Sequence, residues 1–257
     1  MSIYRQTTVR AAKSLPMTEA ERKARVELAA AYRIFDMLGW TEMIFNHITA
    51  RVPGPEKMFL INPFGLHYSE ITASSLVLID IEGNPVRETK WPVNRAGFVI
   101  HSAIHGAIPQ AHCVMHTHTT TGIAVACLDE GLSPDNFYGA MLVGRVAYHE
   151  FEGITVEAGE KDRLVRDIGD KPAVILRNHG LLAWGASVPE AFLMLWTLQR
   201  ACDVQITASG AGRVHPIRSE VFEQTVREGG PAEKRTCDDT FAALQRKLDA
   251  TDPSYRS

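Results

Sequence analysis

Two histidine motifs at the ends of apolar runs most constrain what this chain can fold into. His116 and His118 close the apolar run 113–115, and His179 follows the apolar run 173–176. In a β-strand, side chains two residues apart share a face, so His116 and His118 point the same way. A catalytic zinc ion takes three protein ligands and keeps one position open. We therefore predict a zinc site, or one for another divalent metal, on His116, His118 and His179; the alternative is a polar pair satisfied within a sheet.

The rest of the chain alternates helical and strand patterns. Thr18 and Glu21 have the spacing of a capping box and open an amphipathic segment that Gly39 can end. Ser187 is placed to cap a long apolar helix, after which Gly210 and Gly212 are expected to end the ordered core. The patterns between these points predict strands over 43–52, 59–61, 76–81, 143–148, 174–176 and 181–185, and helices over 94–108, 119–128 and 159–168.

These patterns favour one α/β domain over residues 1–257. We expect three α/β/α layers around a mixed sheet, because the sequence contains no repeat, no Gly-rich phosphate loop and no linker. The ordered core is predicted over 20–212. Residues 1–17 are expected to form an arm that packs on a neighbouring subunit, and the charged segment 213–257 to form one surface helix or a contact with a neighbour.

Composition excludes several classes of function. A net charge of −3 is not the excess of positive charge that is typical of nucleic-acid-binding proteins. No apolar run reaches the roughly eighteen residues of a membrane span, and no secretory signal is visible. The four cysteines lie far apart, which is typical of reduced thiols in a cytoplasmic protein.

Several motifs in unbroken order resemble the class II aldolase/adducin family, and its adducin-like branch most closely. They are Gly39-Trp40, Asn46-His47-Ile48-Thr49, Pro63-Phe64-Gly65, Asn94-Arg95-Ala96-Gly97-Phe98, the two histidine motifs and Ala201-Cys202-Asp203. The resemblance implies a largely antiparallel central sheet and zinc on a His-X-His and a distant Asn-His-Gly. It also implies a homotetramer whose active clefts are lined by two neighbouring subunits.

The resemblance also suggests residues for substrate and proton transfer. Asn46 and Gly65 match positions that hold substrate, although Phe64 stands where the family usually has a phosphate-binding serine. Asp135 and Tyr138 lie in a segment similar to one that takes part in proton transfer in the family's epimerases. The alternatives are a local bond from Asn46 to backbone, and a loop packed by its aromatic residue.

One part of the family's catalytic pattern is missing. Catalytic members carry a carboxylate nineteen residues before the first zinc histidine, preceded by two phosphate-binding serines. Those positions are Gly97, Arg95 and Ala96 here. A typical phosphosugar substrate is therefore not expected, and Glu70 and His101 become further candidates for the missing acid or base.

Two functions remain open from the sequence. The first is a zinc-dependent, aldolase-like enzyme that acts on a small hydroxy-carbonyl compound through a metal-stabilised enolate. The second is a non-catalytic module, similar to the adducin head, that binds partners or oligomerises and keeps the metal site. In both cases His101, His105 and His112 lie near the motif in sequence, and we expect none of them to contact the ion.

Overall fold

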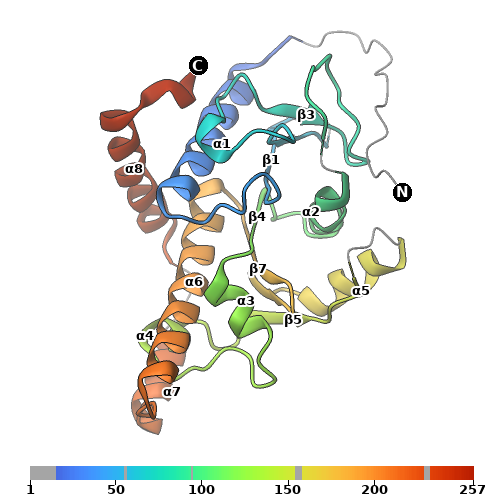
Figure 1. Ribbon diagram of the computed structural model, residues 1–257. Helices are drawn as coiled ribbons and strands as arrows, with labels where there is room; N and C mark the ends of the chain where they lie inside the picture. Colours follow the sequence, from blue (N-terminus) through green and yellow to red (C-terminus); the bar gives the residue numbers. More distant parts are fainter. Residues whose placement is uncertain (1–15, 55–56, 94, 154–157, 229–231) are drawn as a thin grey trace.

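The computed structural model describes residues 16–54, 57–93, 95–153, 158–228 and 232–257, without the side chains of 95–97 and 158 (Figure 1). The predicted N-terminal arm therefore lies almost entirely outside the described residues. No helix within these ranges is both long and apolar enough to cross a bilayer.

The described part of the chain contains one sheet, eight α-helices and two short 3-10 helices. The strands are β1 (Ile48–Arg51), β2 (Phe59–Ile61), β3 (Val77–Ile79), β4 (Cys113–Thr117), β5 (Val146–His149), β6 (Ala173–Leu176) and β7 (Gly180–Gly185). The helices are α1 (Glu19–Met37), α2 (Arg95–Ala107), α3 (Thr120–Ala126), α4 (Phe137–Met141), α5 (Ala158–Ile168), α6 (Val188–Ala211), α7 (Ser219–Glu228) and α8 (Lys234–Thr251), with 3-10 turns η1 (Tyr68–Glu70) and η2 (Pro253–Arg256).

The sheet is mixed and largely antiparallel, as predicted. Its order is β3-β2-β1-β4-β7-β6-β5, and only the pair β5–β6 is parallel. β4 and β6 are both antiparallel to β7, so they run the same way as each other and as β5. The carboxyl ends of β4, β5 and β6 therefore lie at one edge of the sheet, together with the start of β1. We call it the histidine edge, because His116, His149 and His179 lie at these strand ends.

Helices cover both faces of the sheet, which gives the predicted three layers (Figure 1). Side chains alternate along β4: Cys113 and Met115 join the core formed with α1, α6 and α8. Val114 packs instead with Ile104 of α2 and Leu164 of α5. His116 is two residues beyond Val114, so it lies on the face covered by α2 and α5.

The first helix begins as predicted but its capping box is only half formed. Thr18 caps α1 by accepting a hydrogen bond from the Glu21 amide at 3.1 Å. The Glu21 carboxylate does not accept a hydrogen bond from the Thr18 amide, which a complete capping box requires. It accepts from Arg25 Nε at 2.8 Å and from Arg87 Nη2 at 2.7 Å, and these cations hold its pKa below the ordinary value although burial opposes them. Charge-assisted bonds to two guanidinium groups are stronger than one bond to a neutral amide.

The strand predicted over 43–52 is shorter in the structure. β1 begins at Ile48, and Met43 adopts a left-handed backbone conformation with a φ of 47°. Asn46 therefore lies in the connection before the strand and not within it.

The charged C-terminal segment contributes more than the one surface helix expected. α8 packs against both α1 and α6, and it buries Cys237, Phe241 and Leu248. Tyr255 of η2 is also fully buried. The ordered core therefore extends well past Gly212, the C-cap of α6.

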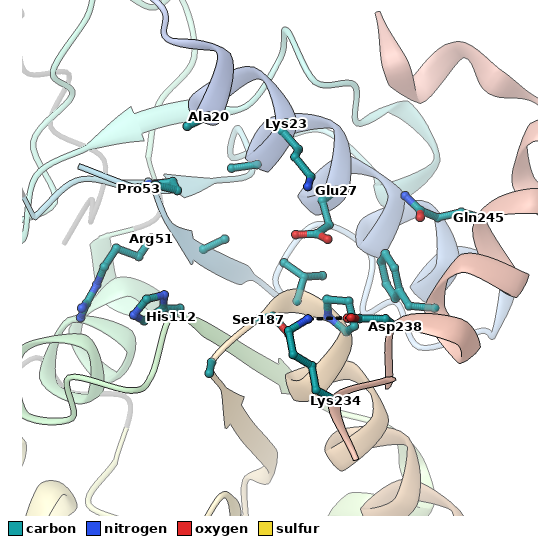
Figure 2. A pocket seen from close by; sticks show the side chains of 16 residues that line it. Ala20, Lys23, Glu27, Arg51, Pro53, His112, Ser187, Lys234, Asp238 and Gln245 are labelled. Carbon is teal, nitrogen blue, oxygen red and sulfur yellow. Dashed lines mark hydrogen bonds and ion pairs between the residues drawn. The ribbon is translucent and has the colours of Figure 1, made fainter. Parts of the chain in front are cut away.

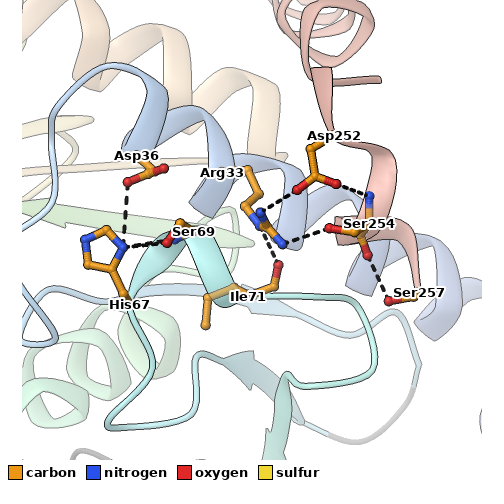
Figure 3. A network of polar contacts seen from close by, with 8 residues as sticks. All are labelled: Arg33, Asp36, His67, Ser69, Ile71, Asp252, Ser254 and Ser257. Atoms are coloured by element: carbon orange, nitrogen blue, oxygen red, sulfur yellow. Dashed lines mark hydrogen bonds and ion pairs between the residues drawn. The ribbon is translucent and has the colours of Figure 1, made fainter. Parts of the chain in front are cut away.

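A polar network ties this segment to the first helix (Figure 3). Arg33 of α1 donates from Nε to Ile71 O at 2.9 Å, and from its two other nitrogens to Asp252 and Ser254, each at 3.2 Å. The amides of Ala73 and Ser74 complete the attachment by donating to the carbonyls of Tyr255 and Ser257.

Candidate metal centre

Two neighbouring strands bring the three predicted histidines together. His116 lies in β4 and His118 directly after its end. His179 ends the three-residue turn that joins β6 to the adjacent β7, and this turn needs a left-handed residue, which Asn178 provides with a φ of 56°. Asparagine adopts this conformation more readily than most residues. The Asn-His-Gly sequence is therefore the turn that places His179 beside β4.

The three rings form a compact cluster. Their ligand nitrogens all lie within 4.8 Å of one another, and Nε2 of His116 is 2.7 Å from Nε2 of His118. The nitrogens of a tetrahedral zinc site, at bond lengths of about 2.0–2.1 Å, are about 3.3 Å apart. The 2.7 Å separation lies below this value and the 4.8 Å limit lies above it, so the three nitrogens are close enough to hold one divalent ion.

The protein orients the most buried of these candidate ligands. His116 Nδ1 lies 2.8 Å from Leu181 O, and a carbonyl only accepts, so Nδ1 carries the hydrogen. The lone pair of His116 is then on Nε2, which points toward the cluster. Metal-binding histidines commonly use their second nitrogen in this way.

Burial keeps the cluster neutral. It holds the pKa of His116 well below its ordinary value, with the neighbouring histidines adding to the effect. Burial also lowers the pKa of His118, and it lowers the pKa of His179 to about 4. Neutral imidazole is the form that binds metal. His116 is buried while His118 and His179 are only half-buried, so the cluster can be reached from one side.

Gly180 allows the two strands to approach. A Cβ at this position would overlap Thr117 O, and it would lie 3.1 Å from His118 Cδ2 and 3.3 Å from His116 Cε1. The glycine after His179 is thus required by the packing of the cluster itself.

Comparison with known proteins assigns the family. Residues 26–206 match the model of the class II aldolase and adducin N-terminal domain. The chain belongs to the class II aldolase and adducin family. It is 45% identical to an aldolase II superfamily protein of known structure from Pseudomonas syringae, with a TM-score of 0.89 and with 94% of this chain and 98% of that chain covered.

Other members of the family bear quite different names. A solved L-fuculose 1-phosphate aldolase from Glaciozyma antarctica PI12 is 30% identical, with a TM-score of 0.80 and with 95% and 97% of the two chains covered. Alpha-adducin of Rattus norvegicus is 40% identical over 94% of this chain, which corresponds to 35% of the adducin. Membership in the class II aldolase and adducin family therefore leaves the activity open.

The two residues predicted to bind substrate both lie near the histidine edge. Asn46 precedes the start of β1, and Gly65 follows β2, whose end pairs with β1 at this edge. Asn46 Nδ2 donates to Trp40 O at 3.4 Å, the local bond considered as an alternative. Its Oδ1 is buried and has no hydrogen-bond partner among the described residues. Their role in the class II aldolase site stays a prediction.

Asp135 and Tyr138 make their contacts elsewhere in this chain. Asp135 Oδ1 accepts from the Ile217 amide at 3.1 Å, and the Tyr138 ring packs edge-on against Trp196 of α6 at 5.6 Å. The first contact joins the loop before α4 to the segment before α7, the second joins α4 to α6, and no described contact joins either residue to the histidine cluster. Their role in proton transfer stays a prediction.

A row of buried histidines continues from the cluster into the α2 layer, which the sequence patterns did not indicate. The His47 ring lies 5.7 Å from that of His116 and 4.2 Å from that of His101. Thr49 Oγ then lies 2.7 Å from His101 Nδ1 and 2.8 Å from His105 Nε2. His105 Nδ1 donates to Ala111 O, so the neutral ring accepts from the Thr49 hydroxyl, which accepts in turn from His101.

This row should make the protein sensitive to acid. Burial lowers the pKa of His105 to about 3 and that of His101 well below its ordinary value. Unfolding returns the pKa values of both histidines toward the ordinary value of about 6.5. Their contribution to stability is therefore complete above about pH 6.5, and it is lost as the pH falls toward the lower pKa of the folded state. We expect the unfolding free energy of metal-free protein to fall below pH 6.5, with each histidine contributing up to about 1.4 kcal/mol per pH unit. Urea unfolding of wild type and of His105→Gln between pH 7 and pH 4.5 measures how much of this pH dependence comes from His105. If the unfolding free energies of the two proteins fall in parallel with pH, the contribution of His105 is contradicted.

A cavity lies at the end of β4 opposite to the histidine cluster (Figure 2). It measures about 460 Å³ and is lined by α1, the ends of β1 and α6, and α8. Lys23, Glu27 and the ion pair of Lys234 with Asp238 at 2.6 Å face it. His112 also lines this cavity, so it lies at the other edge of the sheet from the metal centre.

Proposed function

We propose that the chain is a zinc-dependent enzyme of the lyase type that acts on a small hydroxy-carbonyl compound by enolate chemistry. The observation that supports this most is the cluster of His116, His118 and His179, whose neutral nitrogens converge at the accessible histidine edge. Such a donor set supplies three ligands and leaves a position for substrate oxygen.

The residues of the site would divide the work as follows. Zinc, when bound, would polarise the substrate carbonyl as a Lewis acid. His116, whose ring is fixed by Leu181 O, would help to hold the ion, and the buried Oδ1 of Asn46 is an acceptor available for a substrate hydroxyl. Asp135 and Tyr138 remain candidates for proton transfer in an assembly in which α4 faces a neighbouring cleft.

The substrate is not expected to be a typical phosphosugar. Phe64 and the segment 95–97 lack the hydroxyl groups that the resemblance associates with phosphate. The name of the L-fuculose 1-phosphate aldolase relative therefore does not transfer to this chain. An unphosphorylated hydroxy-ketone or oxo acid fits the residues better.

A homotetramer in the cytoplasm is part of the same proposal. The four cysteines are free thiols, which suits a reducing compartment. We expect light scattering at micromolar concentration to give a mass near four times 28.4 kDa. A mass equal to one chain would contradict the assembly.

Proton abstraction from a simple probe tests the function without knowledge of the natural substrate. Dihydroxyacetone in deuterated water should exchange its carbon-bound hydrogens in the presence of the zinc-loaded protein, as followed by NMR. Metal-free protein and the His179→Ala variant should not accelerate the exchange. Absence of exchange with dihydroxyacetone, hydroxypyruvate and pyruvate alike would reject the enzyme proposal.

The alternative is a binding module similar to the adducin head. The identity to alpha-adducin across nearly the whole chain favours it, as does the absence of a carboxylate at Gly97. A module of this kind would keep its partner binding after zinc is removed, whereas an enzyme of the proposed type would lose its exchange activity.

Restoring the carboxylate at Gly97 separates these possibilities. Gly97 lies one helical turn before His101 in α2, on the same side of the helix; its own surroundings lie outside the described residues. We expect Gly97→Glu to lower the exchange rate at least about tenfold, on the proposal that the altered chemistry uses the space that a glycine leaves at this position. A rise in exchange would instead indicate a degenerate aldolase, and a pure binding module should show neither effect. Gly106→Glu is the matched control, because Gly106 is on the same helix with nothing within 4 Å of an added Cβ.

A further inference from the structure

A fourth histidine reaches the histidine edge from β5. His149 is the last residue of β5 and pairs in register with Leu176, the last residue of β6. The turn after Leu176 carries His179, and the Arg177 amide of this turn donates to His149 O at 2.8 Å. The parallel pairing of β5 and β6 thus places His149 beside the turn that supplies a metal ligand.

An aspartate from α5 fixes the tautomer of His149. Nδ1 lies 2.7 Å from Asp167 Oδ2, and a carboxylate accepts, so Nδ1 carries the hydrogen. The lone pair of the neutral ring is then on Nε2. A histidine oriented by a carboxylate in this way is the usual form of a general base in enzymes.

The free nitrogen is buried and does not have a local partner. The side chain of His149 is 5% exposed, and among the described residues Nε2 makes no hydrogen bond. Glu152 Oε1 lies 3.8 Å from it, too far for a hydrogen bond. Buried polar atoms are nearly always paired, so an unpaired one indicates a water or ligand that belongs there.

His149 and His179 both line a small cavity. It measures about 10 Å³, about the least that can hold one water molecule. Phe151 also lines it, with its ring 6.1 Å from that of His179. The cavity thus has room for one water between His149 and a residue of the histidine cluster.

Other charged groups face His149 from the neighbouring elements. Glu150 and Glu152 come from the loop after β5, Glu160 from α5 and Arg177 from the β6–β7 turn. Glu152 is engaged by Arg163, whose Nε donates to it at 2.7 Å. Arg177 stacks on Tyr148 at 4.4 Å and donates to Leu128 O. Glu160 is the competing candidate for proton transfer, because it is buried and lines the same cavity.

We propose that His149, positioned by Asp167, moves the substrate proton in this protein, in place of the carboxylate that is missing at Gly97. The proposal rests on the function proposed above. Nε2 accepts the proton from the carbon next to the substrate carbonyl, directly or through the water. The electron pair of the broken C–H bond moves to the carbonyl oxygen and gives an enolate. Return of the proton to carbon restores the neutral ring, so no oxidant or reductant is needed.

The first test uses metal-free protein and does not require activity. Long-range proton–nitrogen NMR of labelled protein should show His149 with its hydrogen on Nδ1, the signal being assigned by its loss in His149→Gln. Asp167→Asn should change the balance of the two tautomers. A His149 ring with its hydrogen on Nε2 in wild type would overturn the proposal.

The second test is deuterium exchange into dihydroxyacetone by the zinc-loaded protein. We expect His149→Gln to lower kcat for exchange by at least about 100-fold, the usual contribution of a positioned acid or base. KM and zinc content should stay unchanged, as expected when an interaction made only in the transition state is lost. Asp167→Asn should lower kcat by about tenfold, which is typical for the loss of a residue that only orients the reacting side chain. His112→Gln, at the opposite edge of the sheet, is the matched control.

The outcomes separate this proposal from the one it rests on. If wild type shows no exchange with any probe, both proposals fall. If wild type exchanges and His149→Gln exchanges equally well, only the role of His149 is rejected. A large loss of exchange activity in Glu160→Gln, with no loss in His149→Gln, would also reject the role of His149. It would assign the proton transfer to Glu160.

Discussion

We expect the His116→Ala variant to bind zinc at least about 100-fold more weakly than wild type, because even loss of a partner outside the ligand shell costs 10–100-fold. The effect should be large because His116 is the most buried of the three ligands and the one whose ring is held by Leu181 O. His118→Ala and His179→Ala should also weaken binding. Elemental analysis of protein purified without a histidine tag, followed by competition with a chelator, measures the change.

His101→Ala and His112→Ala are informative controls for this measurement. His101 lies two rings away from His116, and His112 lies at the far end of β4. Both variants should keep about one zinc per chain, the amount expected for a single three-histidine site. Wild type that retains no metal after zinc is added would reject the metal centre itself.

Gly180→Ala should be among the most damaging small changes in the chain. The added methyl would overlap Thr117 O and crowd the rings of His116 and His118. The strands β4 and β7 would have to separate, and overpacking of this kind costs about 1–3 kcal/mol of stability. We also expect zinc binding to weaken, because the ligands on the two strands would move apart.

Urea unfolding and zinc competition on the same sample test this prediction. Gly210→Ala is the matched control, because Gly210 lies in α6 with nothing within 4 Å of an added Cβ. This variant should lose no stability, and helix propensity favours alanine by up to about 1 kcal/mol. Equal stability of Gly180→Ala and wild type would show that the strands tolerate a wider spacing.

The clustering of the three histidines could be predicted because short-range sequence patterns determine their geometry. The strand period puts His116 and His118 on one side, and Asn178 with Gly180 marks the turn that presents His179. The mixed sheet was predictable for the same reason, since short apolar runs typical of strands alternate along the chain with segments of helical spacing. These features depend on residues that are neighbours in sequence or in adjacent strands.

What could not be predicted depends on packing between distant elements. The pairing of His149 with Asp167 requires β5 to lie against α5, and the row from His47 to His105 requires α2 to lie across β1. Glu21 has the spacing of a capping residue but bonds Arg87, sixty-six residues away. The charged composition of 213–257 concealed the burial of Phe241, because a few apolar residues suffice to attach a helix.

The position of the site at the histidine edge has an evolutionary consequence. His47, His149 and His179 lie beside or at the end of strands, while the interior of the sheet is made by other side chains. Substitutions at these ends can change the chemistry without removing the core that keeps the fold. Selection can therefore change reactivity while most of the core is kept, which is how one scaffold can be shared by an L-fuculose 1-phosphate aldolase and by alpha-adducin.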